Sequence, residues 1–273
     1  MEELLGRFPC AVERPEPLKF AWPIILLPDL FSSVRHLAVV RGYLATIGWE
    51  VYAPDLRVTA EMESARAQSE FSFSDLLALS GQALDALGRG AIILGHGAGG
   101  LAALKLAERA EVRAAVAYAP LLPGFKSRLS TGLAARFSIW RRGVIGPPRG
   151  RKLFEFVADA DPFQRDAIIR MMAPESAKLV SDIARGEIAF APAAAPRLIV
   201  AGDSDVFAPL DKSEALAKSI GATFAKIAGR GHWLVGGRAL ERAIAETQRF
   251  LVRSLGQELL LLYPEEWKNE PDD

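Results

Sequence analysis

Short apolar runs alternate with longer amphipathic stretches through most of this chain. Runs typical of buried strands occur at residues 24–27, 49–53, 91–94, 114–118, 197–201 and 222–227. Apolar positions at helical spacing occur in residues 34–47, 74–87, 101–106 and 238–255. A further helix is expected near Asp211, which forms a capping-box pattern with Glu214. Apolar strands that alternate with helices predict an α/β fold, with a doubly wound, mostly parallel sheet covered on both faces.

Residues 121–195 interrupt this alternation. They contain several prolines, and the segments between these prolines are short and amphipathic. We therefore expect a helical cap inserted at 121–195, between two parts of one core domain formed by residues 1–120 and 196–273.

Composition and charge narrow the class of protein. The 273 residues are 50% hydrophobic and 24% charged, as in an ordinary globular protein, and the formal net charge of zero gives no reason to expect a nucleic-acid partner. Every apolar run is far shorter than the roughly 18 residues of a membrane span, so no transmembrane segment is expected. A single cysteine, Cys10, excludes an internal disulfide, and residues 1–5 lack a signal-peptide pattern, so we expect a cytoplasmic protein.

A glycine-rich turn, Gly95-His96-Gly97-Ala98-Gly99-Gly100, lies between an expected strand and an expected helix. Its spacing also satisfies the G-x-G-x-x-G pattern of dinucleotide sites. Such a site needs an acidic residue at the end of the next strand, which here ends Tyr118-Ala119-Pro120 without a carboxylate. We therefore do not expect this turn to bind a dinucleotide.

Two later loops carry an acid and a histidine. Asp205 lies in the loop Gly202–Pro209 after an expected strand, and His232 lies in Gly231-His232-Trp233 after the next one. Because loops at the carboxyl ends of parallel strands converge on one crevice, we expect these two side chains to meet. A carboxylate bonded to one imidazole nitrogen fixes the tautomer and leaves the other nitrogen for proton transfer.

Taken in order, the glycine turn, the acid loop and the histidine loop resemble the α/β-hydrolase family over nearly the whole chain. The resemblance implies an α/β-hydrolase fold, with Gly97 at the position of the nucleophile. It also implies that the amides of Ala98 and Leu30 act as oxyanion-type donors. Two departures stand out, because Gly97 replaces the family's serine and Pro28-Asp29 stands where the family usually has His-Gly.

These residues predict a hydrolase-like enzyme of atypical, serine-independent mechanism. His232 is the expected general base and Asp205 its orienter, acting on a small apolar ester, thioester or carbonyl substrate. The expected pocket also includes Asp29, Phe31, His96 and Trp233. No metal and no organic cofactor is expected, because the three histidines are scattered along the sequence.

Two alternatives for function stay open. Without a nucleophile, the chain is also consistent with a catalytically inactive ligand-binding or scaffold protein on the same fold. The other alternative is a serine hydrolase inactivated by an introduced serine-to-glycine change at Gly97. The oligomeric state is open as well.

Several positions have simpler structural interpretations. We expect His96 to be structural and to point away from the crevice, Asp29 to be a turn residue, and His36 to lie on an exposed helix face. Residues 126–152 hold eight basic residues and no acidic one, interleaved with apolar residues. They fit either a solvated face over the pocket or a contact with an anionic ligand or membrane surface.

Overall fold

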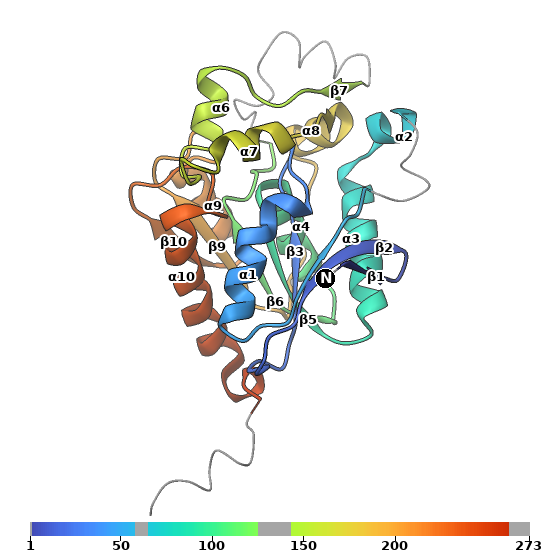
Figure 1. Ribbon diagram of the computed structural model, residues 1–273, viewed down its shortest axis with the longest axis vertical. Helices are drawn as coiled ribbons and strands as arrows, with labels where there is room; N and C mark the ends of the chain where they lie inside the picture. Colours follow the sequence, from blue (N-terminus) through green and yellow to red (C-terminus); the bar gives the residue numbers. More distant parts are fainter. Residues whose placement is uncertain (1, 58–64, 125–142, 262–273) are drawn as a thin grey trace, which may run out of the picture.

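The computed structural model describes residues 2–57, 65–124 and 143–261 (Figure 1). Within these ranges the main sheet has eight strands in the order β1-β2-β4-β3-β5-β6-β9-β10. In chain order they are β1 (Glu2–Leu5), β2 (Phe8–Glu13), β3 (Ile24–Leu27), β4 (Val51–Pro54), β5 (Ala91–His96), β6 (Val112–Tyr118), β9 (Arg197–Gly202) and β10 (Thr223–Ile227). Six neighbours in this order, β4-β3-β5-β6-β9-β10, pair in parallel, which confirms the predicted fold class.

The parallel strands form the core because they are apolar on both faces. Every residue of β3, β4, β5 and β9 is buried, as expected for strands covered on two sides. The predicted strands 24–27, 91–94 and 197–201 coincide with β3, β5 and β9 to within two residues. Their carboxyl ends lie together at one edge of the sheet, and this edge carries the glycine turn.

The N-terminal hairpin was not predicted. β1 pairs with β2, and β2 pairs with β4, both antiparallel, which extends the sheet at one edge. In β2 buried residues alternate with half-buried ones, so this strand lacks the continuous apolar run that marked the others. Pro9 near its start further weakens the strand pattern.

Helices cover both faces of the sheet. α1 and α10 lie in front of it in Figure 1, with α4 behind, and α3 packs on α4. The bounds are η1 (Val34–Leu37), α1 (Ala38–Thr46), α2 (Ala65–Glu70), α3 (Phe73–Leu87), α4 (Gly97–Leu106), α9 (Leu210–Ser219), α10 (Gly237–Leu255) and η3 (Gly256–Leu259). Among the described residues, no helix is long and apolar enough to cross a bilayer.

The predicted capping box at Asp211 is wrong. α9 begins at Leu210 after Pro209, so Asp211 lies inside the first turn and no side chain caps the helix. Proline has no N–H and fixes its own φ, so Pro209 directly precedes the first helical residue, and the helix starts two positions earlier than the capping pattern implied.

The described elements between β6 and β9 lie above the carboxyl ends of the strands in Figure 1 and form the segment above the sheet. Its elements are β7 (Val144–Ile145), α6 (Arg151–Phe156), α7 (Arg165–Met171), β8 (Glu175–Ser176) and α8 (Ala177–Arg185). The division into a core and a cap at 121–195 stays a prediction. Residues 125–142, with most of the basic stretch, lie outside the described residues, whereas Arg151 within it pairs with Glu155 on α6.

His36 does not lie on an exposed face. It is buried, and its Nδ1 accepts a hydrogen bond from the Ser33 N–H while its Nε2 donates to the carbonyl of Ile168 in α7. The prediction failed because residues far along the chain cover η1. His36 thereby ties the segment above the sheet to the loop that follows β3.

Candidate active site

The glycine turn forms because the backbone at the end of β5 passes very close to its neighbours. A Cβ on Gly95 would lie 2.1 Å from the Gly99 carbonyl oxygen, and one on Gly99 would lie 2.4 Å from that of Leu27. Gly97 has a φ of +53°, in the left-handed region that disfavours residues with side chains. The turn therefore brings the start of α4 directly against the loop after β3.

Strand register places Asp29 beside Gly97. β3 and β5 pair in parallel with Leu27 opposite Gly95, and both chains then run two residues further. A Cβ built on Gly97 would lie 1.7 Å from Oδ1 of Asp29 and 1.9 Å from its Cγ. The Asp29 carboxyl group therefore fills the space that a side chain at position 97 would occupy.

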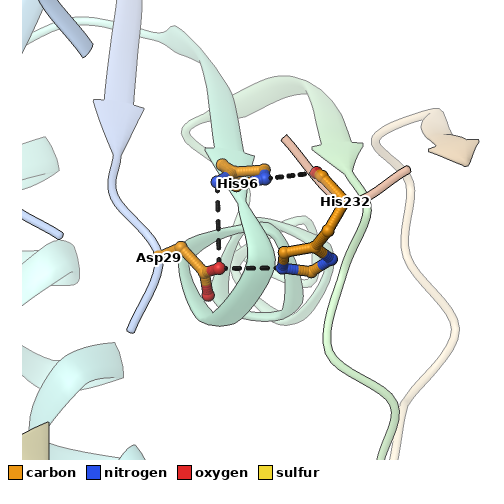
Figure 2. A group of neighbouring side chains, drawn as sticks. All are labelled: Asp29, His96 and His232. Carbon is orange, nitrogen blue, oxygen red and sulfur yellow. Dashed lines mark hydrogen bonds and ion pairs between the residues drawn. The ribbon is translucent and has the colours of Figure 1, made fainter. Parts of the chain in front are cut away.

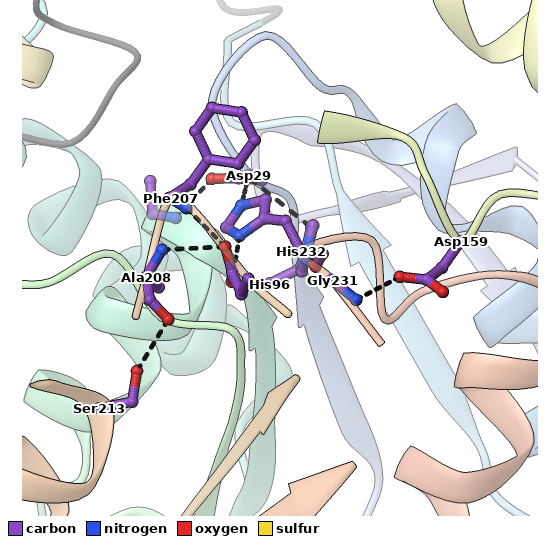
Figure 3. Close-up of polar contacts among 10 residues, drawn as sticks. Asp29, His96, Asp159, Phe207, Ala208, Ser213, Gly231 and His232 are labelled. Atoms are coloured by element: carbon purple, nitrogen blue, oxygen red, sulfur yellow. Dashed lines mark hydrogen bonds and ion pairs between the residues drawn. The ribbon is translucent and has the colours of Figure 1, made fainter. Parts of the chain in front are cut away.

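Asp29, His232 and Asp205 form a continuous hydrogen-bonded chain. His232 Nε2 lies 2.9 Å from Asp29 Oδ2 (Figures 2 and 3). His232 Nδ1 lies 2.8 Å from Asp205 Oδ2. Asp29 and His232 are 0% exposed and Asp205 is 5% exposed. Asp205 comes from the loop after β9 and His232 from the loop after β10, so the structure brings together the predicted pair and adds a second carboxylate.

Asp205 is held by its own loop. Its Oδ1 accepts hydrogen bonds from the amides of Phe207 and Ala208, at 2.7 and 2.9 Å. The rings of Phe207 and Phe156 lie 5.5 and 5.0 Å from the His232 ring, centroid to centroid, and exclude water from that side. Thus Asp205 both shapes its loop and orients the imidazole.

Two carboxylates around one imidazole favour its charged form. Burial alone lowers the pKa of His232, but the charges and hydrogen bonds of Asp205 and Asp29 outweigh it and raise the pKa to about 10. For Asp29, burial has the opposite effect and raises the pKa. The hydrogen bond to His232 and the two nearby histidines outweigh burial and bring the pKa of Asp29 below its usual value. The resting site is therefore an imidazolium between two carboxylates.

His96 points into the site, which corrects the expectation that it faces away. Its Nε2 donates to the His232 carbonyl oxygen at 2.8 Å, and its Nδ1 faces Asp29 Oδ2 at 3.8 Å (Figure 2). Burial lowers the pKa of His96 to about 4, although Asp29 pulls it the other way, so the ring is neutral. The direction of the chain at the end of β5 sets this orientation, and the sequence pattern carries no signal of it.

The histidines are not scattered in space. His96, His232 and Asp29 each present one ligand atom, and the three atoms lie within 4.8 Å of one another. Trp233 packs edge-on against His96 at 5.6 Å between ring centroids and is buried. The sequence argument against a ligand cluster therefore fails on geometry, because strand ends bring distant residues together.

The two expected oxyanion-type amides differ in their availability. The Ala98 N–H donates to Asp29 Oδ1 at 2.7 Å. The Leu30 N–H has no acceptor among the residues that the structure describes. In this arrangement the Ala98 N–H holds Asp29, whereas the Leu30 N–H is not engaged by any described residue.

Phe31, next to Leu30, has a strained backbone that a buried glutamate supports. Its φ is +61°, which is rare for a bulky residue. Its N–H donates to Glu175 Oε2 at 3.3 Å, and Arg57 donates to the same oxygen at 2.6 Å. Glu175, only 2% exposed, therefore helps to fix the loop after β3 from the segment above the sheet.

We expect Glu175→Gln to lower the free energy of unfolding by about 1–3 kcal/mol, because it removes the charge that pairs with Arg57 and leaves a poorer acceptor for Phe31. Urea denaturation measures the change. The matched control is Glu246→Gln, which breaks the exposed Glu246–Arg249 pair and should cost at most about 0.5 kcal/mol. Equal effects at the two positions would contradict the supporting role of Glu175.

Comparisons with known proteins agree with this fold. The chain resembles a monoacylglycerol lipase from Paleococcus ferrophilus at 19% identity, covering 90% of this chain and 98% of that one, with a TM-score of 0.70. A monoglyceride lipase from Saccharomyces cerevisiae gives 15% identity, 93% and 94% coverage and a TM-score of 0.69. A carboxylesterase from Bacillus subtilis gives 17% identity, 92% and 90% coverage and a TM-score of 0.60.

At these identities the structures establish the fold alone. A search of curated protein sequences finds no match to the chain. The model of the alpha/beta hydrolase family, however, matches residues 21–246, which include every strand of the parallel sheet, the glycine turn and the loops that carry Asp205 and His232. This chain therefore belongs to the alpha/beta hydrolase family.

Proposed function

We propose that this protein hydrolyses small, largely apolar esters or thioesters and uses water, rather than a serine, as the nucleophile. The observation that carries the proposal is the position of Asp29. Its carboxylate occupies the space of a side chain at Gly97 and lies 2.9 Å from His232, which Asp205 orients in turn. The names of the similar structures, lipases and a carboxylesterase, support esters as the substrate class.

Asp29 is the proton acceptor in this proposal, instead of His232. Carboxylates accept hydrogen bonds, so His232, with one carboxylate at each ring nitrogen, donates from both and keeps no lone pair for a substrate. Water attacks the carbonyl carbon while its proton passes to Asp29, and the Leu30 N–H supports the developing oxyanion. The bond to the alkoxy oxygen then breaks, His232 protonates the leaving alkoxide, and the proton on Asp29 returns to His232.

The test is hydrolysis of short-chain p-nitrophenyl esters and thioesters by the parent protein and by Asp29→Asn. We expect Asp29→Asn to lower kcat/KM by about 10²–10⁴-fold, the usual contribution of a general base. Asp211→Asn is the control, since that side chain is 74% exposed and its ion-pair partner is Lys212, itself 59% exposed. Unchanged hydrolysis in Asp29→Asn would refute the assignment of Asp29.

A second candidate is a catalytically inactive ligand-binding or scaffold protein. Its support is the complete burial of Asp29 and His232, which satisfy each other as a structural ion pair would. A folded parent protein that hydrolyses no ester or thioester in the same assay would favour this candidate.

The remaining alternative, an introduced serine-to-glycine change, has less support. A side chain at position 97 would overlap Asp29, so Gly97 and Asp29 fit together as a matched pair of changes. A single introduced change at Gly97 would leave the Asp29 substitution without an explanation.

A further inference from the structure

We propose that Asp29, His96 and His232 form a binding site for one divalent transition-metal ion, with zinc as the ion of best fit. Binding of the ion stands on geometry alone. Its role, activation of the attacking water, rests on the proposed hydrolase function.

The three ligand atoms lie at suitable separations. Oδ2 of Asp29 is 2.9 Å from Nε2 of His232 and 3.8 Å from Nδ1 of His96, and all three atoms lie within 4.8 Å of one another (Figure 2). Tetrahedral zinc with bonds of about 2.0–2.1 Å requires ligand atoms roughly 3.3 Å apart. The observed separations bracket this value, so small rotations of the side chains bring all three atoms onto one ion.

His96 gives the clearest sign of a ligand. Its Nε2 contacts a carbonyl oxygen, which only accepts, so Nε2 carries the proton and Nδ1 presents a lone pair. That lone pair faces the Asp29 carboxylate at 3.8 Å, and Nδ1 has no hydrogen bond to any described residue. Two acceptors that face each other in a fully buried place repel, and a cation between them removes the repulsion.

Each of the three residues also has the outer partner that metal ligands require. His232 Nδ1 bonds Asp205, His96 Nε2 bonds the His232 carbonyl, and Asp29 Oδ1 accepts from the Ala98 amide. Metal-binding histidines usually donate their second ring N–H to a carboxylate or a carbonyl, which fixes the tautomer and the ring direction. The structure thus holds all three ligand atoms toward one point.

The set of donors indicates which ion binds. Two imidazole nitrogens and one carboxylate oxygen match catalytic zinc sites, in which three protein ligands leave the fourth position to water. Bound zinc lowers the pKa of that water to about 7, so hydroxide becomes available near neutral pH. Asp29, His96 and His232 would hold the ion, which would replace the proton between Asp29 and His232. The ion would then supply the water activation that Asp29 provides in the metal-free protein.

The experiment measures metal binding directly. The purified protein is stripped with a chelator, titrated with zinc and with cobalt(II), and followed by metal analysis and by visible absorption. We expect one zinc per chain and the intense absorption of tetrahedral cobalt. His96→Gln should weaken zinc binding at least about 100-fold, because it removes one ligand and keeps a side-chain N–H for the His232 carbonyl.

The matched control is His36→Gln, since both nitrogens of His36 already have protein partners and His36 lies outside the cluster. It should bind zinc as the parent does, with circular dichroism showing that both variants fold. A folded parent that takes up no zinc, or equal affinity in His96→Gln, would overturn the metal site. If metal-free protein hydrolyses esters and Asp29→Asn abolishes this activity, the proposed function holds and the metal ion has no role in it. If the protein binds zinc but hydrolyses no ester or thioester, the metal site holds and the proposed function is refuted.

Discussion

Gly97→Ser alone is expected to yield a destabilised protein without esterase activity, whereas Gly97→Ser combined with Asp29→Gly is expected to create a serine esterase. The single change places a Cβ within 1.7 Å of Asp29 Oδ1. Asp29 must then leave its place and lose its bonds to His232 and Ala98, which leaves a buried imidazolium with one carboxylate. Overpacking and the broken pair together cost several kcal/mol.

The double variant removes the obstacle and completes a triad. Without the Asp29 side chain, the new hydroxyl lies within reach of His232 Nε2, while Asp205 still orients the ring through Nδ1. The Ala98 amide becomes available beside that of Leu30, so both oxyanion donors can face a substrate. Because an intact triad contributes about 10⁶ to kcat, even an imperfect one should exceed the single variant by about 10³-fold.

Two measurements check this result. Initial rates on a p-nitrophenyl ester give the gain in kcat/KM, and an organophosphonate probe labels an activated serine covalently. Asp29→Gly alone is the control, since it opens the same space without a nucleophile and must resist labelling. A stable Gly97→Ser single variant that reacts with the probe would show that Asp29 does not fill the nucleophile's space, and it would favour the introduced-change alternative.

The sequence was sufficient for the fold and for the meeting of Asp205 with His232. Continuous apolar strands marked the parallel sheet, and loops after such strands must converge on one edge. Both departures at this edge, Gly97 and Asp29, were visible in the sequence as well. The sequence did not show that these two departures are related. The Asp29 side chain fills the space left at Gly97 only because the register of β3 and β5 places the two residues side by side.

The role of His232 could not be obtained from spacing either. With Asp205 as its single acid partner, His232 is predicted to have a free Nε2 and therefore to act as a base. A second carboxylate at 2.9 Å changes the charge of the ring and turns it into a donor. The orientation of His96 was hidden for a similar reason, since a buried ring at a strand end takes its direction from a carbonyl 136 residues further along the chain.

Asp205→Ala is expected to lower the free energy of unfolding by about 3–5 kcal/mol, and Asp205→Asn by much less. Alanine leaves the amides of Phe207 and Ala208 without their acceptor and takes one of two carboxylates from a buried imidazolium. Asparagine keeps an oxygen for both amides and opposes His232 Nδ1 with an N–H, so the ring becomes neutral and keeps its proton on Nε2, facing Asp29. Urea denaturation, with the exposed Asp211→Ala as a control expected to change by at most about 0.5 kcal/mol, measures the difference. If alanine and asparagine destabilise equally, the loop amides contribute nothing, and the imidazolium pair alone accounts for the need for an acid at this position.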